Sequence, residues 1–222
     1  MGMLGLTAVM GFNMGWVPYF LKRGKTDNAR GEFKTITTIF LGLIGFICFL
    51  VSLWISEIIR VMIFGKTLIG EEFWGCEPIV ILILIGYFFF GTYVIQLPGI
   101  YIKEKTKWIP VFRAIGAFVL ISSSSIFIPI FGIIGAAYAV VLAFFSMSLA
   151  IYIKLQFIYP ISYNWVSVLI PIFFLFIAYL GVENFIFKIL FTFTFPVIWY
   201  FFALEIKDQK ALKKQFNFLI KF

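Results

Sequence analysis

The stretch from Ile79 to Phe145 limits the possible folds more than any other part of the sequence. It holds two long apolar runs joined by a short basic hinge at 103–107, and a third run that follows after only a Pro-Ile-Phe-Gly turn. Each run has roughly the 20 apolar residues that are needed to cross the hydrocarbon core of a bilayer. The runs lack the alternation of transmembrane strands, and backbone groups in lipid must bond internally, so we expect helices.

Composition supports an all-α, polytopic membrane bundle. Of the 222 residues, 63% are hydrophobic and 13% are charged, whereas a soluble domain has about 25% charged residues. The formal net charge is +8, but the basic residues sit at the ends of apolar runs, which fits membrane topology and argues against a nucleic-acid partner. Cys48 lies in an apolar run, Cys76 lies in a loop, and histidine is absent. We therefore predict no disulfide, no metal site and no cofactor.

The sequence predicts seven spans, at roughly 1–21, 34–56, 78–102, 108–129, 131–153, 163–181 and 184–205. Pro18 is expected to break the first span near its end. The segment from Lys22 to Lys34 is predicted to be a polar connection, and Glu57 to Glu77 an interfacial loop with a short amphipathic helix. Residues 207–222 are predicted to form a basic amphipathic tail on the membrane surface.

The positive-inside rule predicts the orientation. All lysines and arginines except Arg60, Lys66 and Lys188 fall on one side of the predicted membrane, so this side is expected to be cytoplasmic. The C-terminus is then inside and the N-terminus outside. The six tryptophans all fall near predicted span ends, as expected of rings at the headgroup level. On the outer side, Glu57 and Arg60 are three residues apart, which predicts a surface ion pair.

The predicted start of the chain is unusual, because Met1 lies outside with no basic flank ahead of the first span. An odd number of helices with such a start is typical of the back portion of a longer protein. A complete seven-helix protein with its N-terminus outside is the alternative interpretation.

Three features carry a family resemblance. An outer loop with Ile63-Phe64-Gly65 is followed by Pro78 and the run ILILIGYFFFGTY, and the hinge KEKTKW leads directly into the next helix. Residues 128–137 read IPIFGIIGAA, and Trp16-Val17-Pro18 precedes a basic loop. In these features the chain resembles the polysaccharide transporter branch of the multidrug/oligosaccharidyl-lipid/polysaccharide flippase superfamily, the Wzx-like flippases. The resemblance covers about residues 1–160, a partial C-terminal lobe, with two additional helices at 161–206.

The resemblance implies a function in surface polysaccharide (O-antigen or capsule) biosynthesis. Proteins of this family flip undecaprenyl-diphosphate-linked oligosaccharides across the bacterial plasma membrane, by alternating access between two lobes around a cationic cavity. This chain would correspond to the eighth through fourteenth helices. The implied partners are membrane lipid, the lipid-linked oligosaccharide and an N-terminal lobe in the same longer chain, because one lobe alone does not form the cavity.

Five polar residues at membrane depth are candidate substrate contacts. Arg113 is about one and a half turns inside the fourth span, where a guanidinium suits a lipid diphosphate, although extension to the cytoplasmic headgroups is slightly favoured. Gln96 and Tyr93, one turn apart, could bond a glycan or, as we favour, a neighbouring helix. Ser122 and Ser123 belong to a run of small hydroxylated residues, for which helix packing is favoured over substrate contact.

Two other classes of protein compete with a transporter. A polymerase or glycosyltransferase of envelope glycan synthesis needs a positioned acid or base. The predicted outer loop offers only Glu71, Glu72 and Glu77 for this task, so no catalytic residue is assigned and transport is favoured over an enzyme. A structural membrane subunit without a substrate is the third option, and it predicts that substitutions affect only stability.

Overall fold

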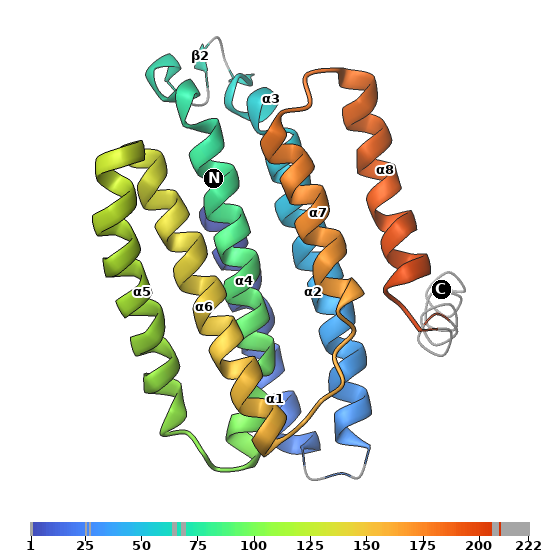
Figure 1. Cartoon of the computed structure of the whole chain (residues 1–222). Helices are drawn as coiled ribbons and strands as arrows, with labels where there is room; N and C mark the ends of the chain where they lie inside the picture. Colours follow the sequence, from blue (N-terminus) through green and yellow to red (C-terminus); the bar gives the residue numbers. More distant parts are fainter. Residues whose placement is uncertain are drawn as a thin grey trace.

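The computed structural model describes residues 2–24, 26, 28–63, 66–67, 70–205 and 209, in which seven helices of at least 15 residues lie side by side (Figure 1). They are α1 (Met3–Arg23), α2 (Ala29–Leu53), α4 (Glu77–Ile102), α5 (Trp108–Phe131), α6 (Ile133–Ile158), α7 (Val166–Leu180) and α8 (Phe185–Phe202). Six of these described helices, all except α7, are long and apolar enough to cross a membrane. The predicted all-helical bundle is therefore confirmed, and its long apolar helices are consistent with a multi-pass membrane protein. The predicted tail at 207–222 lies outside the described residues except for Gln209.

Short elements connect α2 to α4 at the upper end of the bundle in Figure 1. They are α3 (Ile55–Ile59), the two-residue antiparallel strands β1 (Met62–Ile63) and β2 (Lys66–Thr67), and the 3-10 helix η1 (Glu71–Cys76). This agrees with the expected interfacial loop and its short helix. The strands themselves were not predicted.

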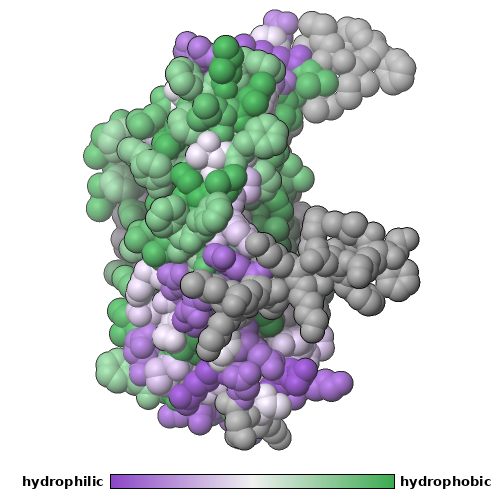
Figure 2. All heavy atoms as spheres, turned by 90° about the vertical axis from the view of Figure 1, so that its right-hand side faces the viewer, coloured by the Kyte–Doolittle hydropathy of each residue, from purple (hydrophilic) through white to green (hydrophobic). Residues whose placement is uncertain are grey.

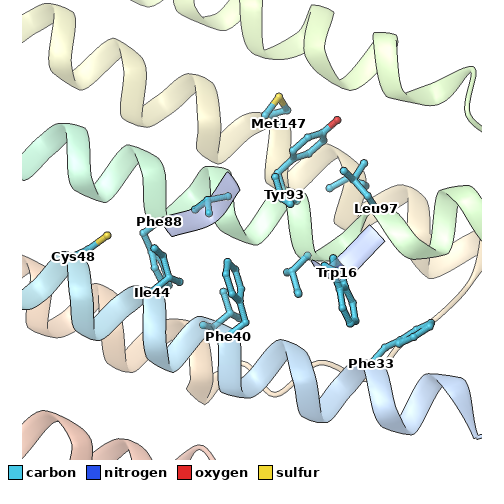
Figure 3. Close-up of a cluster of buried hydrophobic side chains, with 14 of the residues drawn as sticks. Trp16, Phe33, Phe40, Ile44, Cys48, Phe88, Tyr93, Leu97 and Met147 are labelled. Atoms are coloured by element: carbon cyan, nitrogen blue, oxygen red, sulfur yellow. The ribbon is translucent and has the colours of Figure 1, made fainter. Parts of the chain in front are cut away.

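Helix α4 is the centre of the bundle because it packs against α1, α2, α6 and α7, whereas α5 packs on α6, and α8 packs on α7 and α2. The core around α4 is apolar, and Figure 3 shows Phe40 of α2 and Phe88 of α4 among the side chains between these two helices. The outer faces are apolar as well, as with the exposed side chains of Phe118 on α5 and Phe193 on α8. Helices that are apolar on all sides belong in lipid. Figure 2 shows the apolar surface on the α8 side of the bundle, above a polar end.

Glycines let two outer helices approach α2 closely. A Cβ atom at Gly42 would lie 2.1 Å from the Trp199 ring of α8, and one at Gly45 would lie 2.5 Å from Pro171 of α7. Membrane helices associate through such small residues, since lipid gives apolar side chains little reason to prefer each other. The two glycines therefore determine how α7 and α8 dock.

The backbone geometry at the joint between α5 and α6 explains the two glycines of the motif GIIGAA, residues 132–137. Gly132 has φ +59° and its amide donates a hydrogen bond to the carbonyl of Ile128 at 2.8 Å. A Cβ at Gly135 would lie 2.2 Å from the carbonyl oxygen of Phe127. The first glycine thus provides a conformation that other residues rarely adopt, and the second allows close contact between the helix ends.

Helix α7 differs from the predicted span at 163–181. Its 15 residues reach only about 22 Å, which is shorter than the hydrocarbon core. Residues 159–165 before it are not helical. Asn164 bonds the backbone at two helix ends: its Oδ1 accepts from the amide of Val166 at the start of α7 at 3.0 Å, and its Nδ2 donates to the carbonyl of Ala203 at the end of α8 at 2.7 Å. Such side-chain bonds replace the helix bonds that lipid would otherwise demand.

Two predictions about α1 were wrong. Pro18 does not break the helix, which continues to Arg23, and α2 begins at Ala29, so the polar connection is shorter than predicted. Proline removes one helix bond, and the buried Trp16 and Phe20 on either side hold α1 against its neighbours. Trp16 is buried between the helices, and its ring packs edge-on against Phe33 of α2.

Charged side chains divide between the two ends of the bundle. At the lower end in Figure 1, the described basic residues lie at or near the α1–α2, α4–α5 and α6–α7 connections: Lys22, Arg23, Arg30, Lys34, Lys103, Lys105, Lys107 and Lys154. The upper end carries Glu57, Glu71, Glu77 and Glu183 with Arg60 and Lys188. The division agrees with the predicted topology. That the basic end is cytoplasmic stays a prediction.

Candidate functional site

Arg113 is the sixth residue of α5, on the first turns after the basic hinge. It is exposed and borders a groove of about 160 Å³ between α5 and α6. The rest of the groove is lined by Gly116, Ala117, Leu120, Val140, Ala143, Phe144 and Met147. Among the described residues no carboxylate lies within ion-pair distance of Arg113. The guanidinium therefore has no counter-ion in the described structure.

Tyr93 of α4 is buried, and its hydroxyl lies within reach of the Arg113 guanidinium. Figure 3 shows the ring extending past Met147, away from Phe40. Arg113 is the positive charge that acts on this hydroxyl. The structure thus brings Tyr93 and Arg113 together from two helices, a pairing that the sequence did not predict.

Gln96 forms the helix contact that the sequence favoured. It is 6% exposed, and its Nε2 donates to the carbonyl of Thr92 at 2.7 Å and lies 3.3 Å from the hydroxyl of Ser148 on α6. The hydroxyls of Thr92 and Ser148 are 2.6 Å apart. This cluster ties α4 to α6 and lies beside a cavity of about 90 Å³ that α2 and α7 also line.

Ser122 and Ser123 lie apart from Arg113 and Gln96. Their hydroxyls donate to carbonyls of their own helix, at Phe118 and Val119. They are about 14 Å along α5 from Arg113 at 1.5 Å per residue. Ser123 is buried and Ser122 is half-buried. The helix-packing role that the sequence favoured therefore fits Ser123 better than Ser122.

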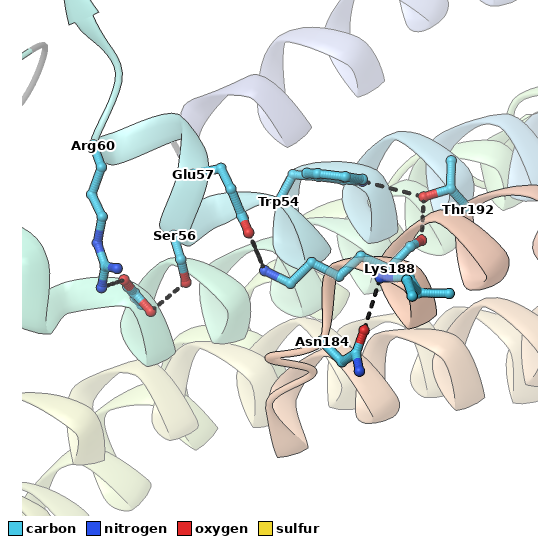
Figure 4. A network of polar contacts seen from close by, with 9 residues as sticks. Trp54, Ser56, Glu57, Arg60, Asn184, Lys188 and Thr192 are labelled. Carbon is cyan, nitrogen blue, oxygen red and sulfur yellow. Dashed lines mark hydrogen bonds and ion pairs between the residues drawn. The ribbon is translucent and has the colours of Figure 1, made fainter.

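A network at the upper end includes a residue that sequence reasoning missed (Figure 4). Lys188 of α8 has only 5% of its side chain exposed, and its Nζ lies 2.6 and 2.9 Å from the two carboxylate oxygens of Glu57 on α3. The carboxylate is 42% exposed, and Trp54 donates nearby to the hydroxyl of Thr192 at 3.2 Å. The signal in the sequence was an ionisable residue inside an apolar span, which is a functional candidate by default.

The predicted ion pair between Glu57 and Arg60 was wrong. Arg60 instead lies with its Nη2 3.7 Å from Glu77, whose other carboxylate oxygen accepts a hydrogen bond from Ser56 at 2.8 Å. The spacing of three residues suggests a contact along one helix, but α3 ends at Ile59. The two side chains therefore find partners on α8 and α4.

Within the described residues, no group of three or more His, Cys, Asp and Glu side chains could hold a metal ion. Cys48 and Cys76 are free thiols. Comparison of the chain with protein-family models, curated proteins and solved structures finds no match.

Proposed function

We propose that this bundle is part of a transporter that flips an undecaprenyl-diphosphate-linked oligosaccharide across the bacterial plasma membrane, with Arg113 contacting the diphosphate. One observation carries the proposal: the Arg113 guanidinium borders an open groove and has no acidic partner in the described structure. A lone charge at membrane depth is costly. A phosphate, bound through two parallel N–H bonds, compensates it better than a single headgroup oxygen or water.

The groove beside Arg113 also suits a lipid. Gly116 and Ala117 of α5 face Ala143 of α6 with small side chains, so an extended chain can lie close to the backbone. The groove begins at the basic end of the bundle, where the diphosphate of a lipid carrier would lie if this end is cytoplasmic. Tyr93 places its hydroxyl beside the same guanidinium.

An enzyme is less well supported. The carboxylate of Glu77 already accepts a hydrogen bond from Ser56 and pairs with Arg60. Glu71 lies exposed on η1. A catalytic acid or base needs a fixed position next to its substrate.

Alternating access needs a second helical body, which in this proposal is the other lobe of a longer chain. Binding, rather than transport, is therefore the property to measure on this chain.

The test is retention of undecaprenyl diphosphate by the purified chain in nanodiscs of a neutral lipid, measured by native mass spectrometry. Arg113→Gln should weaken binding about tenfold to a hundredfold, since hydrogen bonds to charged groups contribute about 1.5–3 kcal/mol. Arg113→Lys should bind at an intermediate level, because an ammonium keeps the charge and loses the fork geometry.

Arg30→Gln is the matched control, because Arg30 is an exposed arginine at the same end, 4.8 Å above the Tyr159 ring. It should bind within about twofold of the unmodified chain, a difference of only about 0.4 kcal/mol. An equal loss in both variants would contradict the proposal, because it would show attraction to basic charge in general. Unchanged binding in Arg113→Gln would contradict it as well.

A further inference from the structure

A polar cleft opens at the end of the bundle opposite Arg113. Its volume is about 470 Å³, which is within the range of small-molecule sites, about 300–1,000 Å³. The α2–α3 corner, the start of α4 and the loop between α7 and α8 form its walls. The polar side chains among its lining residues are Ser52, Ser56, Glu57, Arg60, Glu77, Tyr179, Glu183 and Lys188.

Two buried groups show that the cleft is more than a gap between helices. Lys188, the buried cation of the cleft, is held by Glu57 (Figure 4). Ser52 is 2% exposed, lines the same cleft, and its hydroxyl has no hydrogen-bond partner in the described structure. Buried hydroxyls are nearly always hydrogen-bonded, so the unpartnered Ser52 points to a polar group that enters the cleft.

The charges of the cleft favour a neutral occupant. Lys188 is paired with Glu57, and Arg60 is paired with Glu77. An anion would have to displace these carboxylates and would also meet the exposed Glu183, whereas a cation would compete with two basic side chains already in place. Hydroxyl groups can donate to the carboxylates and accept from the ammonium and guanidinium without breaking either pair.

We propose that this cleft binds a neutral, polyhydroxylated ligand, the chemistry of a sugar. The identity of that ligand rests on the proposed function: it is the glycan of the lipid-linked unit after the glycan has crossed to the outer side. Arg113 and the cleft then mark the two ends of the transport path. Arg113 binds the diphosphate at the basic end before the lipid-linked unit crosses, and the cleft binds the glycan at the opposite end after it has crossed.

The experiment is saturation-transfer NMR on the purified chain in nanodiscs with soluble probes. Glucose, galactose, N-acetylglucosamine and maltose test neutral sugars, glucuronate tests an anion and spermidine a cation. At least one neutral sugar should give a transfer signal that glucuronate and spermidine do not match. The signal should fall at least fivefold in Ser52→Ala and in Lys188→Met.

Lys154→Met is the matched control, since it removes a lysine at the opposite end of the bundle, where Lys154 lies 3.8 Å above the Trp108 ring. It should keep the full signal. Ser52→Ala removes one atom, so it tests the cleft even if Lys188→Met does not fold. The absence of a signal from every neutral sugar, or an undiminished signal in Ser52→Ala, would overturn the proposal and leave a cleft filled by water.

The two proposals can fail separately. If Arg113→Gln retains undecaprenyl diphosphate while the cleft variants lose the sugar signal, the proposed function fails and the cleft stands as a sugar site. If Arg113→Gln loses the lipid and no sugar signal is found, the cleft proposal alone fails.

Discussion

Replacement of Glu57 with leucine should destabilise the bundle by roughly 3–5 kcal/mol, as expected when one partner of a buried ion pair is removed. The Lys188 side chain is 5% exposed, and its ammonium donates hydrogen bonds to both oxygens of the Glu57 carboxylate. Without Glu57, a buried charge is left unpaired between α8 and α3. The measurement is the free energy of unfolding in mixed micelles, with the amount of denaturing detergent as the variable.

The opposite change, Lys188→Met, should cost much less, about 1 kcal/mol. It leaves Glu57 unpaired, but that carboxylate is 42% exposed and water can reach it. The double variant with both substitutions should recover most of the stability lost in Glu57→Leu, because no charge is then buried. Glu183→Leu removes an exposed carboxylate on the same cleft and should have little effect. Equal losses in Glu57→Leu and Lys188→Met would contradict the buried role of Lys188.

Replacement of Gly42 with alanine should lower stability by about 1–3 kcal/mol, the usual cost of overpacking. The new Cβ would lie 2.1 and 2.2 Å from two ring carbons of Trp199. Trp199 is itself packed against the core, so α8 has to move away from α2. The same micelle unfolding assay measures the loss.

Gly15→Ala is the control for this substitution. It lies in α1, where a Cβ meets nothing within 4 Å, so the change should be neutral or stabilising by up to about 1 kcal/mol, the helix propensity difference. If Gly42→Ala and Gly15→Ala behave alike, the close approach of α8 to α2 is wrong. A double-mutant cycle with Trp199→Leu should show that the cost of alanine at Gly42 depends on the indole ring.

Helix positions could be predicted from the sequence because each span has to satisfy its own backbone in lipid. The spans at 78–102 and 108–129 agree with α4 and α5 to within two residues. The same rule failed at α7, since hydropathy does not show that Asn164 accepts from the amide of Val166 at the start of this helix. Pro18 was also misjudged, because one lost bond inside a packed helix costs less than a helix end in lipid.

Side-chain partners were predicted less well, because they depend on how the helices pack. Gln96 was expected to contact another helix, and it does, but its partner Ser148 is 52 residues away in sequence. Lys188 was counted only as a charge on the outer side, although it lies inside an apolar helix. The position of Trp16 near a predicted span end did not show that its ring is buried among Phe20 and Phe33.

The central claim is that the two charged ends of the bundle lie on opposite sides of the membrane, because both proposed binding sites depend on this orientation. Cysteine labelling tests it directly in intact cells that express the chain. Cys76 is a partly exposed thiol at the acidic end, and Cys48 is fully buried and should stay silent. Lys105→Cys in a Cys76→Ser background places an exposed thiol on the basic hinge. A membrane-impermeant maleimide should label Cys76 in intact cells and Lys105→Cys only after permeabilisation. Labelling of the hinge in intact cells, with Cys76 protected, would contradict the orientation and with it the entry of lipid at Arg113.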